Sequence, residues 1–195
     1  MMEAIRDIPY ELAPEGLRRD IAILMHQVWP EVSALPDDAV IPNPHEEGWK
    51  VQSFYVYADG QLASYAGIVQ KQVTHRGALF NIAGLSCVAT DPAYRGRSLG
   101  HQTVAAATRW LERQPDVDFG IFTCHPSLAE FYDRAGGWRV VPDVLLIGSE
   151  QDGALTSDSL PVVVLQRLFS EKAKTLGSQL RHTTINLDVP VGQFL

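Results

Sequence analysis

Hydrophobic residues recur at helical spacing in three stretches of the chain. The first stretch follows Pro14 and ends at Pro30, and its apolar residues are Leu17, Ile21, Leu24, Met25 and Val28. The second stretch covers residues 98–114, where Val104, Ala107 and Leu111 share one face among good helix formers. The third stretch covers residues 127–135 and also carries its apolar side chains on one face. These patterns predict three helices.

Runs with strand character lie between and after these helices. Four early runs, 51–58, 62–70, 71–75 and 78–90, are punctuated by turns at Asp59-Gly60 and Arg76-Gly77. They predict an antiparallel meander. The short run 118–123 follows the second helix, and a strand–helix–strand order implies a parallel pair. Two late strands are expected at 138–148 and 161–168, so the predicted fold class is α+β.

Composition and charge narrow the class of protein. The chain has 195 residues, 46% of them hydrophobic and 20% charged, which is typical of one soluble globular domain spanning 1–195. It has no apolar run long enough for a membrane span and no secretory leader, so we expect a cytoplasmic protein without membrane contact. The net charge of −7 argues against nucleic acid as a partner.

Two further segments are expected to be irregular or to pack late. Residues 30–48 carry four prolines and five acidic residues, which is typical of a long binding loop. Asp37, Asp38, Glu46 and Glu47 in this loop either hold a cationic substrate or are simply solvated. The tail 180–195 ends in Phe194-Leu195 and is expected to pack on the rest of the chain.

The turn "TDPAYRGRSLGHQ", residues 90–102, has the features of an anion site. A strand that turns through glycines into a helix leaves backbone N–H groups pointing in one direction, and the helix dipole adds positive potential there. Arg95 and Arg97 add full charges, while Gly96 and Gly100 let a bulky anion approach. A diphosphate fits this description, and a solvated basic turn is the alternative. The spacings of a P-loop and of a dinucleotide-binding fold are both absent.

The two arginines and two glycines of this turn belong to a longer pattern, "VATDPAYRGRSLG", in which Val88, Pro92, Arg95 and Gly100 keep a fixed register. Downstream, "FYDRAGGW" forms a second signature at 131–138. Together they resemble the pyrophosphate loop and second motif of the GNAT superfamily of acyl-CoA N-acyltransferases. The chain departs from that pattern at Ser98, where the family has glycine, and by one extra residue, Gly137. The likeness extends over about residues 50–170.

Within this superfamily, "TCHPSLAEFYDRAGGWR" and "INLDVPVGQF" resemble the branch of aminoglycoside 2′-N-acetyltransferases and nodulation-factor N-acyltransferases. The resemblance implies a mixed, mostly antiparallel sheet with a splayed parallel strand pair, flanking helices and a C-terminal extension at about 170–195. It also implies acetyl-CoA (CoA) as cofactor. The cofactor-binding residues that it implies are Val88, Ala89, Thr90, Arg95, Gly96, Arg97, Ser98, Leu99, Gly100 and His101.

Within that set, the main-chain groups of Val88 and Thr90 would bond the pantetheine amides, and the Val88 N–H would polarise the thioester carbonyl. The N–H groups of residues 97–101 and the Arg95 side chain would hold the pyrophosphate. The resemblance further assigns Tyr132 as the general acid that protonates the leaving thiolate, although its helical spacing equally fits a core aromatic.

The general base is open. Ser86 stands where related enzymes carry a carboxylate, and His125 at the start of the third helix is the other candidate, with a surface histidine as the alternative reading. Cys87 and Cys124 either form an acyl-cysteine with His125 as base or are inert packing residues. The remaining histidines, His26, His45, His75 and His182, show no ligand spacing, so no metal is expected.

The leading hypothesis is therefore an N-acetyltransferase that moves an acetyl group from acetyl-CoA to a primary amine of a small, cationic acceptor by direct attack. Two alternatives stay open: a CoA-binding module without turnover, and an N-acyltransferase for longer chains. A homodimer is a further expectation, since dimers are common in this superfamily.

Overall fold

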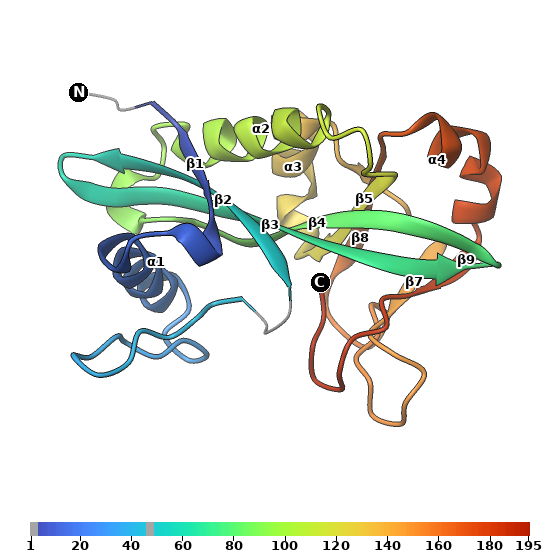
Figure 1. Cartoon of the computed structure of the whole chain (residues 1–195), viewed down its shortest axis with the longest axis horizontal. Helices are drawn as coiled ribbons and strands as arrows, with labels where there is room; N and C mark the ends of the chain where they lie inside the picture. Colours follow the sequence, from blue (N-terminus) through green and yellow to red (C-terminus); the bar gives the residue numbers. More distant parts are fainter. Residues whose placement is uncertain (1–3, 46–48) are drawn as a thin grey trace. The chain divides into compact units, whose positions relative to one another are not determined.

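Seven strands form the main sheet of the protein (Figure 1). The structure is a computed structural model that describes residues 4–45 and 49–195. The strand order is β1-β2-β3-β4-β5-β8-β6. The strands of this sheet are β1 Arg6–Pro9, β2 Lys50–Ala58, β3 Gln61–His75, β4 Ala78–Thr90, β5 Phe119–Cys124, β8 Val163–Leu168 and β6 Arg139–Val140. A second sheet pairs β7 Val144–Ile147 with β9 Thr183–Asn186.

The helices follow the predicted order. They are α1 Glu15–Val28, α2 Leu99–Leu111, α3 Ala129–Gly136 and α4 Glu171–Thr175, with short 3-10 turns η1 Tyr10–Leu12, η2 Pro92–Tyr94, η3 Pro126–Leu128 and η4 Gly177–Leu180. The described chain divides into two units: residues up to Val69 with Leu85–Thr108, and Gln70–Gly84 with Arg109–Leu195.

The mixed α+β class is confirmed by the pairing of the strands. β4 and β5 run parallel through the pairs Ile82–Phe119 and Ala83–Gly120. The pairs β1/β2, β5/β8 and β6/β8 are antiparallel. The meander, the crossover helix α2 and the closing strand β8 therefore lie where the sequence pattern predicts them.

One predicted strand is wrong. Residues 138–148 do not form a single strand, because the chain leaves the main sheet near Pro142. β6 pairs with β8 before this residue, and β7 pairs in parallel with β9 after it. Proline has no N–H for a ladder and restricts the residue before it, which explains a break between two strands at this point.

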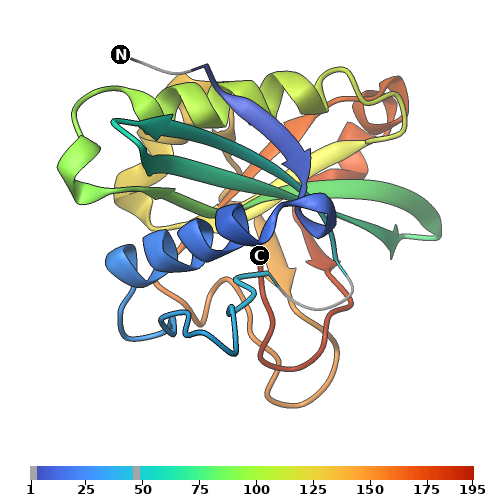
Figure 2. The ribbon, with the colours of Figure 1, turned by 60° about the vertical axis from the view of Figure 1, so that its left-hand side comes forward.

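In the first unit, α1 and the start of α2 lie on opposite faces of the strands (Figure 2), and a hydrophobic layer lies between each helix and the strands. On one face, the apolar stripe of α1 packs with Leu62, Tyr65 and Ala89. On the other face, Ala63, Tyr94 and Leu99 form a second cluster at the start of α2. Along β2, Tyr55 and Tyr57 pack on the first cluster whereas Val56 and Ala58 belong to the second, so the two layers follow from the alternation of side chains along this strand.

Two glycines of the second unit, Gly84 in β4 and Gly120 in β5, have no room for a side chain. A Cβ atom on Gly120 would lie 2.4 Å from the indole ring of the fully buried Trp138. A Cβ atom on Gly84 would lie 2.8 Å from the Ile121 carbonyl. Contacts this short do not occur in real structures, so both positions require glycine.

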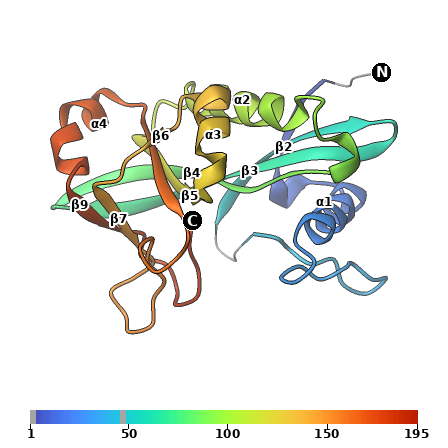
Figure 3. The ribbon, with the colours of Figure 1, turned by 180° about the vertical axis from the view of Figure 1, so that it is seen from behind.

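The tail packs as expected. β9 lies beside β7 in the second unit (Figure 3), and Leu180, Ile185, Leu187 and Val189 are buried. At the end of the chain, the N–H of Thr123 in β5 donates to the Leu195 carbonyl at 3.1 Å. Leu195 therefore satisfies a donor of β5 just beyond the two-residue ladder with β4.

A buried polar chain crosses the core of the first unit. His45, 6% exposed, bonds the Tyr65 hydroxyl through Nε2 at 2.7 Å, and the Ser53 hydroxyl lies 3.0 Å from the same oxygen. The ring fits because Gly67 in β3 has no side chain: a Cβ there would lie 2.6 Å from His45 Cε1. Burial lowers the pKa of His45 to about 4. The imidazole is therefore neutral near neutral pH.

This buried imidazole predicts a specific acid sensitivity. In the unfolded chain His45 regains a pKa near its ordinary value, so below pH 6.5 the unfolded state binds a proton that the folded state refuses until about pH 4. Stability is complete above this window and falls as the pH drops through it. Between pH 7.5 and pH 5 the His45 contribution to the free energy of unfolding should fall by about 2 kcal/mol.

Urea unfolding of wild type and His45→Gln at the two pH values measures this difference. The variant should lose less stability on acidification than wild type does. His182→Gln, which replaces a histidine whose side chain is 85% exposed, serves as the control and should behave like wild type. Equal acid losses in wild type and His45→Gln would contradict the prediction.

Candidate functional site

The turn before α2 keeps its main-chain donors open. Gly96 has φ +78° and Ser98 has φ +61°, and such left-handed residues beside a helix start turn consecutive N–H groups to one side. The first main-chain hydrogen bond from the helix back to this turn runs from the Gln102 N–H to the Ser98 carbonyl at 3.0 Å. Among the described residues, no acceptor is bonded to the N–H groups of residues 96–100. An anion is the missing partner that such a turn suits.

The turn is anchored by residues that precede it. The Asp91 carboxylate accepts from the Ala93 N–H at 2.8 Å and so caps η2. The buried Tyr94 hydroxyl donates to the Ala58 carbonyl at 3.1 Å. These two contacts fix the loop to the end of β2, so that its shape exists before any ligand binds.

The two arginines differ in their contacts. The Arg97 guanidinium lies 4.9 Å above the centre of the Tyr94 ring and 3.8 Å from the Asp59 carboxylate. Arg95 is exposed, and within the described part of the chain no carboxylate forms an ion pair with it. Arg95 is therefore the cation whose charge is available to a ligand at this turn.

Hydrogen bonds at the end of β4 leave alternate residues unused on one edge. The Ala89 carbonyl accepts from the Ser64 hydroxyl at 3.1 Å, and the Asp91 N–H donates to the Ala63 carbonyl at 2.9 Å. Both groups therefore face β3. Because successive residues of a strand point their main-chain groups to opposite edges, those of Val88 and Thr90 face away from β3. This orientation is the one that the resemblance requires of them.

Cys87 interrupts the regular strand. Its φ of +54° lies in the left-handed region, which is rare for a residue with a side chain. Its sulfur donates to the Pro44 carbonyl at 3.3 Å, and the Ser86 hydroxyl lies 3.5 Å from the same sulfur. The kink thus places Ser86, Cys87 and Val88 next to the proline-rich segment of the first unit.

The remaining candidates lie in the second unit. Tyr132 in α3 is 6% exposed, and its ring packs edge-on against Phe122 and Phe131 at 5.0 Å each. Burial raises the pKa of its phenol, with a smaller effect from Cys124, so the hydroxyl stays protonated at neutral pH. Burial also raises the pKa of the Cys124 thiol to about 11, which disfavours its use as a nucleophile.

His125 is exposed and caps a turn. Its Nδ1 lies 2.8 Å from the Ser127 hydroxyl and accepts from the Ser127 N–H at 3.3 Å. The residue thereby caps the 3-10 turn that precedes α3. Nδ1 is engaged in this local contact. A proton-accepting role for His125 stays a prediction.

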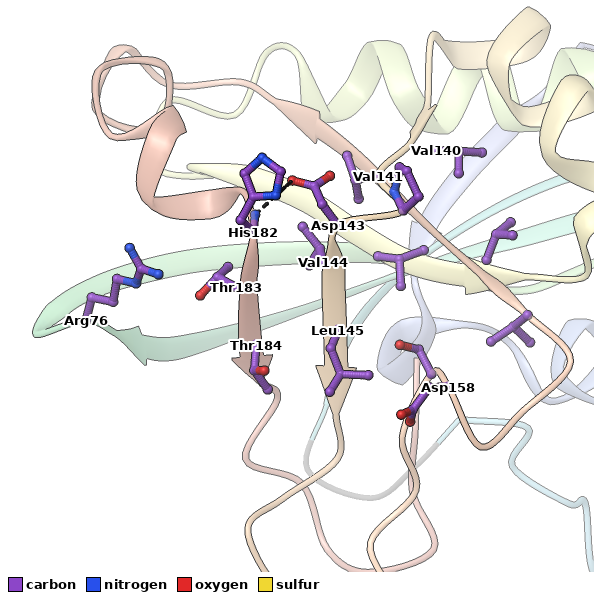
Figure 4. Close-up of a pocket in the computed structure, with 15 residues that line it drawn as sticks. Arg76, Val140, Val141, Asp143, Val144, Leu145, Asp158, His182, Thr183 and Thr184 are labelled. Carbon is purple, nitrogen blue, oxygen red and sulfur yellow. Dashed lines mark hydrogen bonds and ion pairs between the residues drawn. The ribbon is translucent and has the colours of Figure 1, made fainter.

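Two of the cavities in the described part of the chain differ in their relation to the predicted site residues. The larger one, about 710 Å³, belongs to the second unit and contains none of the residues predicted for the site (Figure 4). Its carboxylate Asp143 is engaged by Arg181 at 2.7 Å and by the His182 N–H at 2.8 Å. The smaller cavity, about 360 Å³, lies in the first unit and is lined by Cys87 together with residues from α1 and the proline-rich segment.

The acidic residues of that segment have separate fates. The Asp37 carboxylate accepts from the N–H groups of Ala39 and Val40 at 2.8 and 2.7 Å, so it stabilises its own turn. Asp38 is exposed. Glu46 and Glu47 lie outside the described residues. Within the described part, no three His, Cys, Asp or Glu side chains are grouped as metal ligands, and no helix has the length and apolar character to cross a membrane.

Sequence reasoning missed the residues behind and around the smaller cavity. His45 and Trp29 belong to no recognisable motif, so their positions came only from the structure. Two signals pointed to them: a glycine inside a strand, Gly67, and apolar residues such as Val32 in an otherwise polar loop.

Comparisons with known proteins identify the family of the chain. A family model described as acetyltransferase (GNAT) domain matches residues 27–141. Among solved structures, the Escherichia coli protein ElaA is similar over 86% of this chain and 99% of its own, with 17% identity and a TM-score of 0.58. An acyl-CoA N-acyltransferase from Pseudomonas aeruginosa gives 18% identity, 86% and 99% coverage, and a TM-score of 0.56.

A third similar structure is the GNAT family N-acetyltransferase YhbS from Escherichia coli in complex with CoA. It shares 16% identity over 94% of this chain and 91% of its own, with a TM-score of 0.57. No curated protein matches the chain. Identities this low show the fold alone, whereas the family model covers more than half of the sequence. The chain therefore belongs to the family of acetyltransferase (GNAT) domains.

Proposed function

We propose that this protein transfers an acetyl group from acetyl-CoA to a primary amine of a small, cationic acceptor by direct attack. The observation that carries the proposal is the open row of N–H groups at residues 96–100, with the exposed Arg95 beside it. A diphosphate is the anion that fits several aligned amides and one guanidinium. The main-chain groups of Val88 and Thr90, which face away from β3, would hold the pantetheine arm.

Acetyl-CoA, when bound, supplies an activated thioester. The Val88 N–H would donate to its carbonyl oxygen, where negative charge grows during attack. As the amine nitrogen forms its bond to carbon and the C–S bond breaks, the Tyr132 phenol gives its proton to the leaving sulfur. The amine loses one proton to a base, for which Ser86 and His125 are the proposed positions. The raised pKa of Tyr132 supports its role as the acid.

A second function, CoA binding without turnover, is favoured by one observation: the position of the missing carboxylate holds Ser86, whose hydroxyl donates to the sulfur of Cys87. The finer placement in the aminoglycoside 2′-N-acetyltransferase and nodulation-factor branch, a cytoplasmic location and a homodimer belong to the same proposal. The reduced thiols of Cys87 and Cys124 support the cytoplasmic location.

The cofactor site is tested with Arg95→Ala. CoA should raise the melting temperature of wild type, and the variant should bind CoA about tenfold more weakly or worse, because a charge-assisted contact to phosphate is lost. Arg109→Ala removes an exposed arginine from the last turn of α2, the helix that follows this turn, and serves as the matched control. Isothermal titration with CoA measures both affinities. Equal losses in the two variants, or no CoA binding by wild type, would remove the pyrophosphate assignment.

Tyr132→Phe tests the acid. The variant keeps the buried ring, so the melting temperature and CoA affinity should stay near wild type while kcat falls about 100-fold. Release of thiol from acetyl-CoA in the presence of an amine panel measures kcat. Tyr55→Phe in β2 is the control for loss of a phenol elsewhere. Unchanged turnover in Tyr132→Phe would take this residue out of the mechanism, and no thiol release by wild type with any amine would favour the binding module.

Ser98→Gly tests the departure from the family pattern. A left-handed φ costs a residue with a side chain about 1–2 kcal/mol, and the entropy of glycine offsets part of that gain. The free energy of unfolding should therefore rise by about 0.5–1 kcal/mol, with CoA affinity at least retained. Ser178→Gly, at an exposed residue of η4 whose φ is not positive, should give no gain. Weaker CoA binding by Ser98→Gly would mean that the serine hydroxyl itself is a ligand.

A further inference from the structure

The cavity of about 360 Å³ in the first unit is lined by apolar groups and by neutral polar groups. It lies between α1 and the proline-rich segment, and its walls include Met25, Trp29, Val32, Pro42 and Pro44. The polar lining residues, Ser33 and Asn43, are neutral. Of the lining residues that the structure describes, none carries a charge. A ligand with several ammonium groups would find no ion-pair partner on these walls, whereas an aromatic or branched aliphatic group would bury apolar surface there.

Cys87 connects this cavity to the proposed chemistry. It lines the cavity, and the next residue along β4 is Val88, whose N–H is proposed to polarise the thioester carbonyl. Consecutive Cα atoms are about 3.8 Å apart, so the cavity ends roughly one residue from the acyl group to be transferred. The left-handed kink at Cys87 is what separates its contacts from those of Val88.

The loop over the cavity shows unused apolar surface. Val32 lines the cavity and is 83% exposed, and Trp29 at the end of α1 is 37% exposed. The nearby carboxylate of Asp37 is occupied by two backbone N–H groups of its own turn, which also lower its pKa. The loop thus offers apolar contacts to a ligand, while the Asp37 carboxylate stabilises the loop itself.

We propose that the cavity holds the body of the acceptor, and that the acceptor is a monoamine on an aromatic or branched aliphatic group, such as an arylalkylamine. This inference rests on the proposed function, and it narrows the substrate class: the positive charge of the acceptor is the reacting ammonium itself. Polyamines and amino sugars, which carry several charges on a polar frame, should be poorer substrates, so the likeness to the aminoglycoside branch would not extend to the acceptor.

A cavity without charged lining residues also helps to explain how the reaction proceeds with serine at position 86. Burial disfavours the ammonium form, so the amine gives its extra proton to water and binds neutral. Its lone pair forms the N–C bond as the C–S bond breaks, the nitrogen then loses one proton to solvent, and the sulfur gains the proton of Tyr132. Solvent returns a proton to the phenol. The atoms and charges balance without a carboxylate.

The first experiment compares amines at a fixed, saturating concentration of acetyl-CoA, with thiol release as readout. 2-Phenylethylamine and 3-methylbutylamine should give kcat/KM values at least tenfold above those of spermidine and of an amino sugar such as kanamycin. A preference for spermidine or kanamycin would overturn the inference while leaving the proposed function intact.

The second experiment fills the cavity. Ala34 lines it and is exposed, and Ala39 lies on the same loop, is also exposed and does not line it. Ala34→Trp should raise KM for 2-phenylethylamine about tenfold without changing the acetyl-CoA-induced shift in melting temperature. Ala39→Trp should change neither quantity. Equal effects of the two variants would overturn the assignment of the cavity to the amine. So would an Ala34→Trp effect seen only when octanoyl-CoA replaces acetyl-CoA, because the cavity would then hold a longer acyl chain.

Direct binding separates this inference from the proposed function. Trp29 lines the cavity, so 2-phenylethylamine should change the tryptophan fluorescence of wild type, and this change should be absent in Trp29→Phe. Binding without thiol release would refute the transferase and retain the ligand class. Absence of a saturable fluorescence change would refute the ligand class whatever the turnover.

Discussion

The main-chain hydrogen bonds of β4 are the constraint on which the site depends. At Ile82 and Ala83 this strand pairs with β5, whereas at Ala89 and Asp91 its groups are bonded to Ser64 and Ala63 of β3. A strand can serve only one neighbour with each residue, because its donors and acceptors alternate between edges. Val88 and Thr90 are therefore left with their polar groups directed away from β3, where a ligand with amide groups can complete them.

Two left-handed residues bracket this stretch of chain. Cys87 and Ser98 both hold positive φ values although each carries a side chain. Such conformations persist only where the surroundings impose them, and they gather at functional positions. At Cys87 the surroundings are the Pro44 carbonyl and the α1 cluster; at Ser98 they are the anchored turn and the start of α2. The strain thus lies at both ends of the segment proposed to bind the cofactor.

Much of the fold could be predicted because periodicity is a local property. The apolar stripe of α1, the alternation in β2 and the glycine-rich turn before α2 are each legible within about 15 residues. The short β1 is not, since four residues ending in proline carry little alternation, and its place depends on pairing with β2. The break at Pro142 was visible as a residue, yet the destinations of β6 and β7 depend on partners that follow later in the chain.

The candidate site divides in the same way. Arg95, the open amides and Tyr132 were found from motifs, because cofactor chemistry fixes the spacing of those residues. His45 and the cavity beside Cys87 depend on how a proline-rich segment folds over α1, and no spacing rule describes that. Gly67 was a local clue, because a glycine inside a strand often marks the close approach of another group.

Gly84 and Gly120 have a consequence for how relatives of this protein are read. Each tolerates no larger residue, one because of a carbonyl and the other because of an indole ring. Both would therefore be invariant in a set of aligned sequences, and both lie at or beside the short ladder between β4 and β5. Invariance at these two places reports steric exclusion in the sheet, so a search that ranks positions by conservation would rate them alongside chemically active residues although they take no part in any reaction.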